Sequence, residues 1–251
     1  MIYILIFVIG SIIGSFLNVC IYRLPRNKSI IFPSSYCPSC NTKIKWFDNI
    51  PIISFILLQG KCRSCKGKIS LRYPLVEILT SVLLILLYSR YSLSLSFFAY
   101  SLLTFSLIIV TFIDFEQQII PDEITYPLIV IGLILSFFSP RIGIIDSILG
   151  ILICGGLLYL IVIVSRGGMG GGDVKLAAAI GSFLGFKAGL ASLVFAFISG
   201  GLVGAILLLT GIKGRKDPIP FGPFIVFGAL IIVLFSELIP RVFLFFGINI
   251  A

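Results

Sequence analysis

The chain has 251 residues, of which 59% are hydrophobic and only 12% are charged, with a net charge of +9. An ordinary soluble domain is about 25% charged, so the composition excludes that class and predicts an all-α protein that crosses a membrane several times. The absence of histidine excludes catalysis by histidine and metal sites with histidine ligands.

Apolar segments that could form membrane helices follow one another along the chain. A helix needs about 20 apolar residues to cross a bilayer. We expect the first segment, within residues 1–22, to be a retained helix and not a cleaved signal peptide. The sequence predicts about eight transmembrane helices, at residues 2–20, 74–89, 96–113, 125–138, 144–164, 176–186 (a short segment), 188–210 and 223–246.

A polar segment at residues 23–73 separates the first helix from the remaining bundle, residues 74–251, and holds four of the six cysteines. Cys37 and Cys40 form one CxxC pair, and Cys62 and Cys65 form a second. This spacing is typical of a tetrahedral zinc site with four thiolates, although two disulfides or free thiols are alternatives. Four protein ligands leave no open position, so we expect a structural zinc ion that staples a small domain.

The distribution of basic residues predicts an orientation. If the cysteine segment faces the cytoplasm, alternation across eight helices places nearly all of the 19 Lys and Arg residues on the cytoplasmic side. The positive-inside rule therefore predicts a cytoplasmic cysteine domain and external termini. The exceptions are Arg90, Arg141, Lys187 and Arg241.

Three aspartates stand at the ends of apolar segments. Asp114 ends one segment, at the helix terminus that disfavours an anion, whereas Asp122 follows Pro121 as at a helix start. Asp173 follows a run of glycines that would let a substrate backbone come close. Two aspartates in one desolvated site share a proton and supply one base and one acid. We therefore predict a dyad in which Asp173 is the base and Asp114 the acid, provided that their helices are adjacent.

These residues resemble those of the bacterial type IV prepilin peptidases, which are GxGD intramembrane aspartyl proteases. The resemblance extends in order along most of the chain. It is carried by residues 14–25, the two CxxC pairs, residues 46–51, 60–65, 72–77, 114–122, 170–173 and 219–223.

The resemblance implies a bifunctional enzyme of the bacterial inner membrane. It would cleave the basic leader of prepilins or pseudopilins after a glycine, at the cytoplasmic face, and then N-methylate the new N-terminus with S-adenosylmethionine. Asp114 and Asp173 would be catalytic, Asp122, Gly170 and Gly172 would support them, and the four cysteines would bind zinc. The cofactor site is not readable from a motif, and its candidates are Asn18, Arg23, Trp46, Asn49, Arg72 and Glu77.

The expected partners are prepilin or pseudopilin substrates, membrane lipid and the assembly machinery of a pilus or secretion system, without nucleic acid. Three other functions stay open at this point. The first is a leader peptidase without methyltransferase activity. The second is a proton-coupled transporter that uses Asp114 and Asp173 as a relay. The third is a non-catalytic assembly scaffold that docks through its cysteine domain.

Overall fold

The computed structural model describes residues 1–139, 142–165, 168–214 and 217–245, and these are helical apart from loops and two isolated β-bridges. Four basic residues that bear on the orientation, Arg141, Arg166, Arg215 and Lys216, and the last residue of segment 223–246 lie outside this range. The chain forms two compact units, Met1–Ser92 and Leu93–Ala251. The all-α membrane class that we expected is confirmed.

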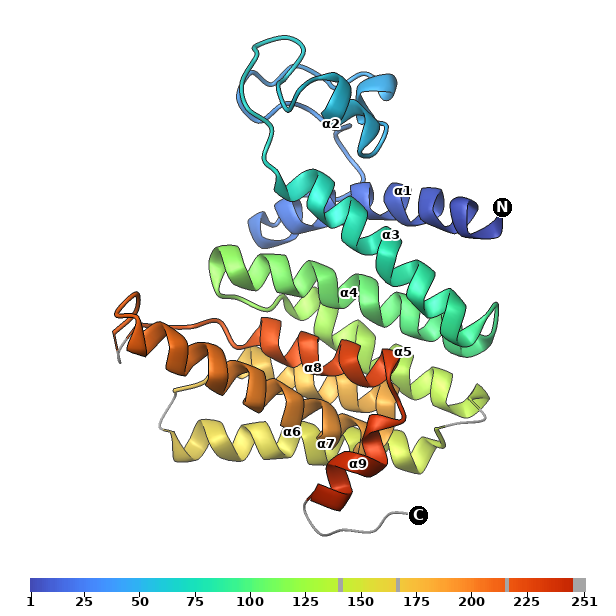
Figure 1. Ribbon diagram of the computed structural model, residues 1–251, viewed down its shortest axis with the longest axis vertical. Coiled ribbons are helices and arrows are strands. Elements are labelled where there is room, and N and C mark those ends of the chain that lie inside the picture. Colours follow the sequence, from blue (N-terminus) through green and yellow to red (C-terminus); the bar gives the residue numbers. More distant parts are fainter. Residues whose placement is uncertain (140–141, 166–167, 215–216, 246–251) are drawn as a thin grey trace. The chain divides into compact units, whose positions relative to one another are not determined.

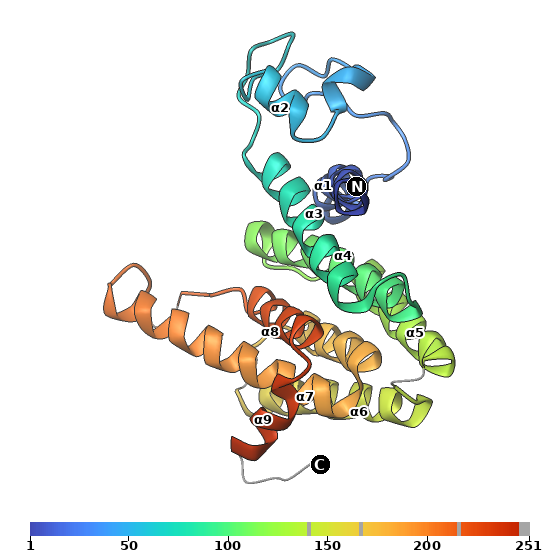
Figure 2. The same cartoon turned by 45° about the vertical axis from the view of Figure 1, so that its right-hand side comes forward.

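Unit 1 consists of two long helices that pack on each other and the polar segment between them. In both Figure 1 and Figure 2 this segment lies beyond the N-terminal end of α3. Its elements are α1 (Ile2–Arg23), η1 (Leu24–Arg26), η2 (Trp46–Asn49), α2 (Ile53–Leu57) and α3 (Arg72–Tyr91).

Small residues allow α1 and α3 to approach closely. A Cβ atom added at Gly10 would lie 2.6 Å from the Cα of Ser81, and one at Gly14 would lie 2.7 Å from the Cα of Glu77. The Ser81 hydroxyl also donates a 3.0 Å hydrogen bond to the carbonyl of Phe7. Close backbone contact and a buried interhelical hydrogen bond are typical of helix packing in lipid.

Unit 2 is a helical bundle in which α7 is the central element. Helices α5, α6 and α8 all pack against α7, and α6 has the most extensive contact. The elements are α4 (Leu95–Gln117), α5 (Asp122–Phe138), α6 (Ile144–Val164), α7 (Gly171–Leu209), α8 (Gly222–Leu234) and α9 (Leu238–Phe245).

Helix α7 is broken at Gly185, which has φ 75° and ψ 176°. A Cβ atom at Gly189 would lie 3.5 Å from the Cα of Gly181. Residues eight positions apart in a straight helix are separated by about 12 Å, so the chain must fold back at the break. The break separates the predicted segments 176–186 and 188–210.

All eight predicted segments are helical over most of their described length, except Thr210 at the end of 188–210 and residues 235–237 within 223–246, but the number of candidate spans is smaller than eight. By length and composition, five helical stretches of the described chain could cross a membrane, or six if the pair of α8 and α9, bent by 115°, forms one span. Two physical reasons explain the difference. Helix α5 has only 17 residues, and the two segments on either side of Gly185 form the single 39-residue element α7.

Candidate active site and metal centre

The two CxxC pairs adopt the same local conformation. In each, the residue after the second cysteine donates its backbone N–H to the carbonyl of the first, from Asn41 to Cys37 at 2.8 Å and from Lys66 to Cys62 at 3.0 Å. These two donors have left-handed backbones, with φ of 58° at Asn41 and 60° at Lys66. The turns therefore aim both sulfurs of a pair to the same side.

The four sulfurs converge on one point. All lie within 4.8 Å of one another, and the Sγ atoms of Cys37 and Cys65 are 3.9 Å apart. Tetrahedral zinc with Zn–S bonds of about 2.3 Å requires sulfurs about 3.8 Å apart. All six cysteines of the chain are free. The donor set and its spacing therefore fit a zinc ion, with Cys37, Cys40, Cys62 and Cys65 as ligands.

The electrostatics of the cluster also suit a cation. Hydrogen bonds from Thr42 lower the pKa of Cys40 to about 6, and the backbone N–H groups of Cys65 and Ser64 lower the pKa of Cys62. A hydrogen bond from the backbone of Gly67 lowers the pKa of Cys65. The hydrogen bonds between Cys65 and the other cysteines, of which that with Cys40 is the largest, outweigh this effect and raise the pKa of Cys65 to about 11. A metal ion would let all four ionise together, because it neutralises their mutual repulsion.

An ion pair ties the second CxxC turn to η2. Arg63 donates hydrogen bonds of 2.7 to 3.0 Å to both oxygens of Asp48. These bonds lower the pKa of Asp48. The pair joins segments 15 residues apart in a domain with little core of its own.

Asp114 and Asp173, predicted from the sequence as a dyad, come from different helices of unit 2. Asp114 lies near the C-terminal end of α4 and Asp173 in the first turn of α7. They are 5% and 7% exposed, respectively. Their carboxylates are close enough to repel each other electrostatically, so the fold brings together two residues that are far apart in the sequence.

Two glycines and one isoleucine pack close together next to Asp114 and Asp173. A Cβ atom at Gly222, at the start of α8, would lie 2.6 Å from Oδ2 of Asp114 and 3.3 Å from Cδ1 of Ile120. A Cβ atom at Gly172 would lie 2.9 Å from the Cβ of Ile120. No prediction from the sequence included Ile120, whose only signal was its position between Asp114 and Asp122.

The other predicted residues of this region have more local roles. Gly170 is the N-cap of α7, and its carbonyl accepts a 3.2 Å hydrogen bond from the backbone of Asp173. Asp122 starts α5, and both of its oxygens accept hydrogen bonds of 2.7 and 2.8 Å from Lys175. The Lys175 ammonium group also lies 5.0 Å from the ring centroid of Tyr126. Asp122 therefore has both a helix-start position and a partner of its own.

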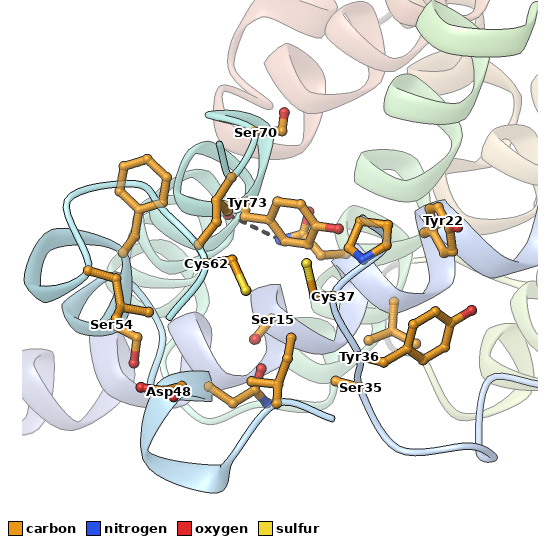
Figure 3. A pocket seen from close by; sticks show the side chains of 18 of the residues that line it. Ser15, Tyr22, Ser35, Tyr36, Cys37, Asp48, Ser54, Cys62, Ser70 and Tyr73 are labelled. Carbon is orange, nitrogen blue, oxygen red and sulfur yellow. Dashed lines mark hydrogen bonds between the residues drawn. The ribbon is translucent and has the colours of Figure 1, made fainter. Parts of the chain in front are cut away.

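Unit 1 contains a cavity of about 440 Å³ between the cysteine segment and helices α1 and α3. Figure 3 shows Cys37, Cys62 and Tyr73 on its wall. Trp46 does not line it and is 81% exposed. The other cofactor candidates named from the sequence all line it: Asn18, Arg23, Asn49, Arg72 and Glu77.

Two family models match the chain, and the boundary between them falls close to the boundary between unit 1 and unit 2. Residues 8–91 match the Bacterial Peptidase A24 N-terminal domain, and residues 101–209 match the Type IV leader peptidase family. No solved structure gives a significant match.

Curated relatives named prepilin leader peptidase/N-methyltransferase match over nearly the whole chain. The protein of Neisseria gonorrhoeae is 37% identical over 93% of this chain and 91% of its own length. That of Bacillus subtilis (strain 168) is 36% identical over 93% and 94%, and that of Aeromonas salmonicida (strain A449) is 33% identical over 96% and 93%. The chain therefore belongs to the type IV leader peptidase family.

Proposed function

We propose that this protein cleaves the basic leader of a prepilin or pseudopilin after a glycine and then N-methylates the new N-terminus. The observation that supports the cleavage step is the pair of buried carboxylates, Asp114 and Asp173, held within electrostatic range by α4 and α7. Both aspartates lie in the part of the chain that matches a family of leader peptidases. Prepilin substrates and the machinery of a pilus or secretion system are the partners that this function requires.

The dyad has the chemistry for amide hydrolysis. Two neighbouring buried carboxylates cannot both ionise easily, so one holds a proton. Asp173 lies in the first turn of α7, where the helix dipole favours its charge, and we assign it as the base that removes a proton from water. Asp114 then protonates the leaving nitrogen. Gly170 has no side chain, which leaves room beside Asp173 for an extended substrate backbone, whereas Gly172 accommodates Ile120.

The remaining parts of the proposal concern unit 1. The four cysteines hold a structural zinc ion, and S-adenosylmethionine supplies the methyl group. We assign residues 23–73 to methyl transfer and residues 74–251 to the peptidase. The contact boundary at Ser92 groups α3 with the cysteine segment, as a compact unit. The positive-inside rule places the cysteine segment and the aspartates on the cytoplasmic side.

Replacement of either aspartate tests the peptidase. Purified Asp114→Asn and Asp173→Asn variants should lose cleavage of a prepilin while they retain zinc. Asp146→Asn is the matched control, because Asp146 lies on α6 next to the break at Gly185 and away from the dyad. Full cleavage by either dyad variant would contradict the assignment.

The intact mass of the product tests the second activity. Incubation of the protein with a prepilin and S-adenosylmethionine should yield a mature pilin that carries one added methyl group. A cleaved product without the methyl group would support a leader peptidase without methyltransferase activity.

A further inference from the structure

We propose that the cavity of unit 1 binds the methyl donor, and that Glu77 neutralises the positive charge of this ligand. The inference rests on the proposed methyltransferase activity and adds a location and a charge partner to it. The cavity volume of about 440 Å³ lies within the range of about 300–1,000 Å³ that is usual for small-molecule sites.

Glu77 is a buried carboxylate that faces the cavity without a cationic partner. It lies on α3, is 6% exposed and lines the cavity. Its Oε2 accepts a 2.7 Å hydrogen bond from the backbone of Ile52, and the side chain of Ser15 also hydrogen-bonds to it. No ion pair involves Glu77 in the described part of the chain. A buried charge without a counter-charge is costly, and a cationic ligand would remove that cost.

The backbone of Ile52 is strained in the position that reaches Glu77. Ile52 has φ 62° and ψ −53°, which a β-branched residue rarely adopts. Strain of this kind persists only where the surrounding structure enforces it, and it is concentrated at functional sites. Here it directs an N–H group to one oxygen of Glu77 and so fixes the carboxylate at the cavity wall.

Asn18 supplies a second unsatisfied polar group. It lines the cavity and is 1% exposed. Its amide nitrogen donates to the carbonyls of Tyr73 at 3.1 Å and Gly14 at 3.3 Å. Its Oδ1 has no hydrogen-bond partner among the described residues. A buried acceptor normally has a donor, and a bound ligand would provide one.

The chemistry of the cavity fits S-adenosylmethionine. This ligand carries a sulfonium, an ammonium and a carboxylate group, hydrogen-bond donors on its adenine and ribose, and a flat base. For the positive groups, the donors and the base, the cavity offers the carboxylate of Glu77, a free acceptor on Asn18 and four aromatic side chains, which are Tyr22, Tyr36, Phe55 and Tyr73. For the ligand's carboxylate it offers basic side chains, which are Arg23, Arg26, Lys43, Arg63, Lys68 and Arg72.

Neither of two other cavities in the described chain offers this combination. A neighbouring cavity of unit 1, of about 310 Å³, has no carboxylate in its lining. A cavity of unit 2 has a volume of only about 20 Å³.

Binding by the full-length protein in detergent tests the proposal with two ligands. Sinefungin is an analogue of S-adenosylmethionine with an ammonium group in place of the sulfonium, whereas adenosine carries no positive charge. Glu77→Gln should weaken sinefungin binding by about tenfold or more, as expected for a lost charge-assisted contact, and leave adenosine binding within about twofold. Isothermal titration calorimetry measures both affinities, and the zinc content shows that the variant is folded.

Two further variants make the test specific. Glu123→Gln is the matched control, because it removes a carboxylate that is exposed on α5 and does not line the cavity. It should leave sinefungin binding within about twofold of the unchanged protein. Asn18→Ala should weaken both ligands, because the missing acceptor is not selective for charge.

The outcomes separate the site from the activity. Two results would overturn the role of Glu77. One is a Glu77→Gln variant that binds sinefungin as tightly as the unchanged protein, and the other is a variant that loses the same factor of affinity for sinefungin and for adenosine. If the unchanged protein methylates pilin under these conditions, the proposed function still stands. A protein that neither methylates cleaved pilin nor binds sinefungin would overturn the proposed methyltransferase function and this inference together.

Discussion

Gly171 and Gly172 are neighbours in the chain but have different surroundings. A Cβ atom at Gly172 would lie 2.9 Å from the Cβ of Ile120, whereas one at Gly171 would meet no atom within 4 Å. Only Gly172 therefore has to be glycine for steric reasons. Because Gly172 directly precedes Asp173, any shift that relieves this contact would also move the carboxylate.

The first prediction compares alanine at these two positions. Gly172→Ala should lower kcat/KM for prepilin cleavage by about tenfold or more, because overpacking costs about 1–3 kcal/mol. Gly171→Ala should keep kcat/KM within about twofold, because its methyl group enters open space. Equal activity of the two variants would show that the contact with Ile120 does not position Asp173.

At the residue scale, the chemistry of their side chains made the cysteines and aspartates candidates for the sites. The residues that pack around them carry no such signal in the sequence. The two sulfurs of each CxxC pair lie on the same side because the turn fixes its own geometry locally. The approach of Gly222 to Asp114 depends instead on how α8 packs in the bundle. The strain at Ile52 and the unpaired Oδ1 of Asn18 likewise arise from tertiary contacts that no local pattern encodes.

At the scale of elements, the break in α7 depends on one glycine. Gly185 has a backbone conformation that is essentially restricted to glycine. An added Cβ atom would also lie 2.8 Å from an oxygen of Asp146 on α6. The fold-back of α7 therefore cannot tolerate a side chain at this position without rearrangement.

The second prediction concerns the stability of this break. Gly185→Ala should lower the free energy of unfolding by about 1–3 kcal/mol, measured as a lower midpoint of thermal unfolding in detergent. The control is Gly204→Ala in the same element, where an added Cβ meets no atom within 4 Å. It should leave the midpoint unchanged or raise it slightly, because alanine favours helix over glycine. A midpoint for Gly185→Ala equal to that of the control would contradict the argument.

The third prediction concerns the metal. Cys62→Ser should greatly reduce the bound zinc, measured by elemental analysis of the purified protein, because one of four thiolates is lost. It should also weaken sinefungin binding, since Cys37 and Cys62 form part of the cavity wall. Cys20→Ser on α1 should retain zinc, because Cys20 is not part of the cluster. Full zinc content in Cys62→Ser would exclude the four-thiolate site.

At the scale of elements, the apolar segments of the sequence predicted the positions of the helices well. The number of spans was overestimated because a count of apolar segments does not reveal a helix that folds back on itself. The 17 residues of α5 show the same limit, since an apolar segment can form a helix at the lower end of the length that crosses a bilayer.

For the whole molecule, the fourth prediction concerns orientation. If the cysteine segment faces the cytoplasm, the loop between α3 and α4 is external and the loop between α7 and α8 is internal. A membrane-impermeant thiol reagent should label Leu93→Cys on intact spheroplasts and Pro218→Cys only after the membranes are opened. Both positions are exposed. Peptide mass spectrometry locates the label, and the reverse pattern would overturn the orientation.

Composition alone predicted the class of the whole molecule, because so few charged residues cannot cover a soluble surface. It could not predict where the chain divides into compact units. The boundary falls after Ser92, beyond α3, because α1 and α3 pack together through Gly10 and Gly14. A hydropathy pattern places α3 with the later helices, since it contains no information on which helix packs against which.

The position of Gly185 also limits how far the first part of α7 can reach across a bilayer. From Asp173 to Gly185 the helix rises only about 18 Å, and tilt shortens this reach further. The hydrocarbon core of a membrane is about 30 Å thick, so this segment cannot extend from one surface to the other. If Asp173 lies at the cytoplasmic surface, the break at Gly185 lies inside the hydrocarbon core unless the lipid around unit 2 is thinner. Shorter-chain phospholipids would reduce this mismatch, so reconstitution into them should speed cleavage if the mismatch limits the rate.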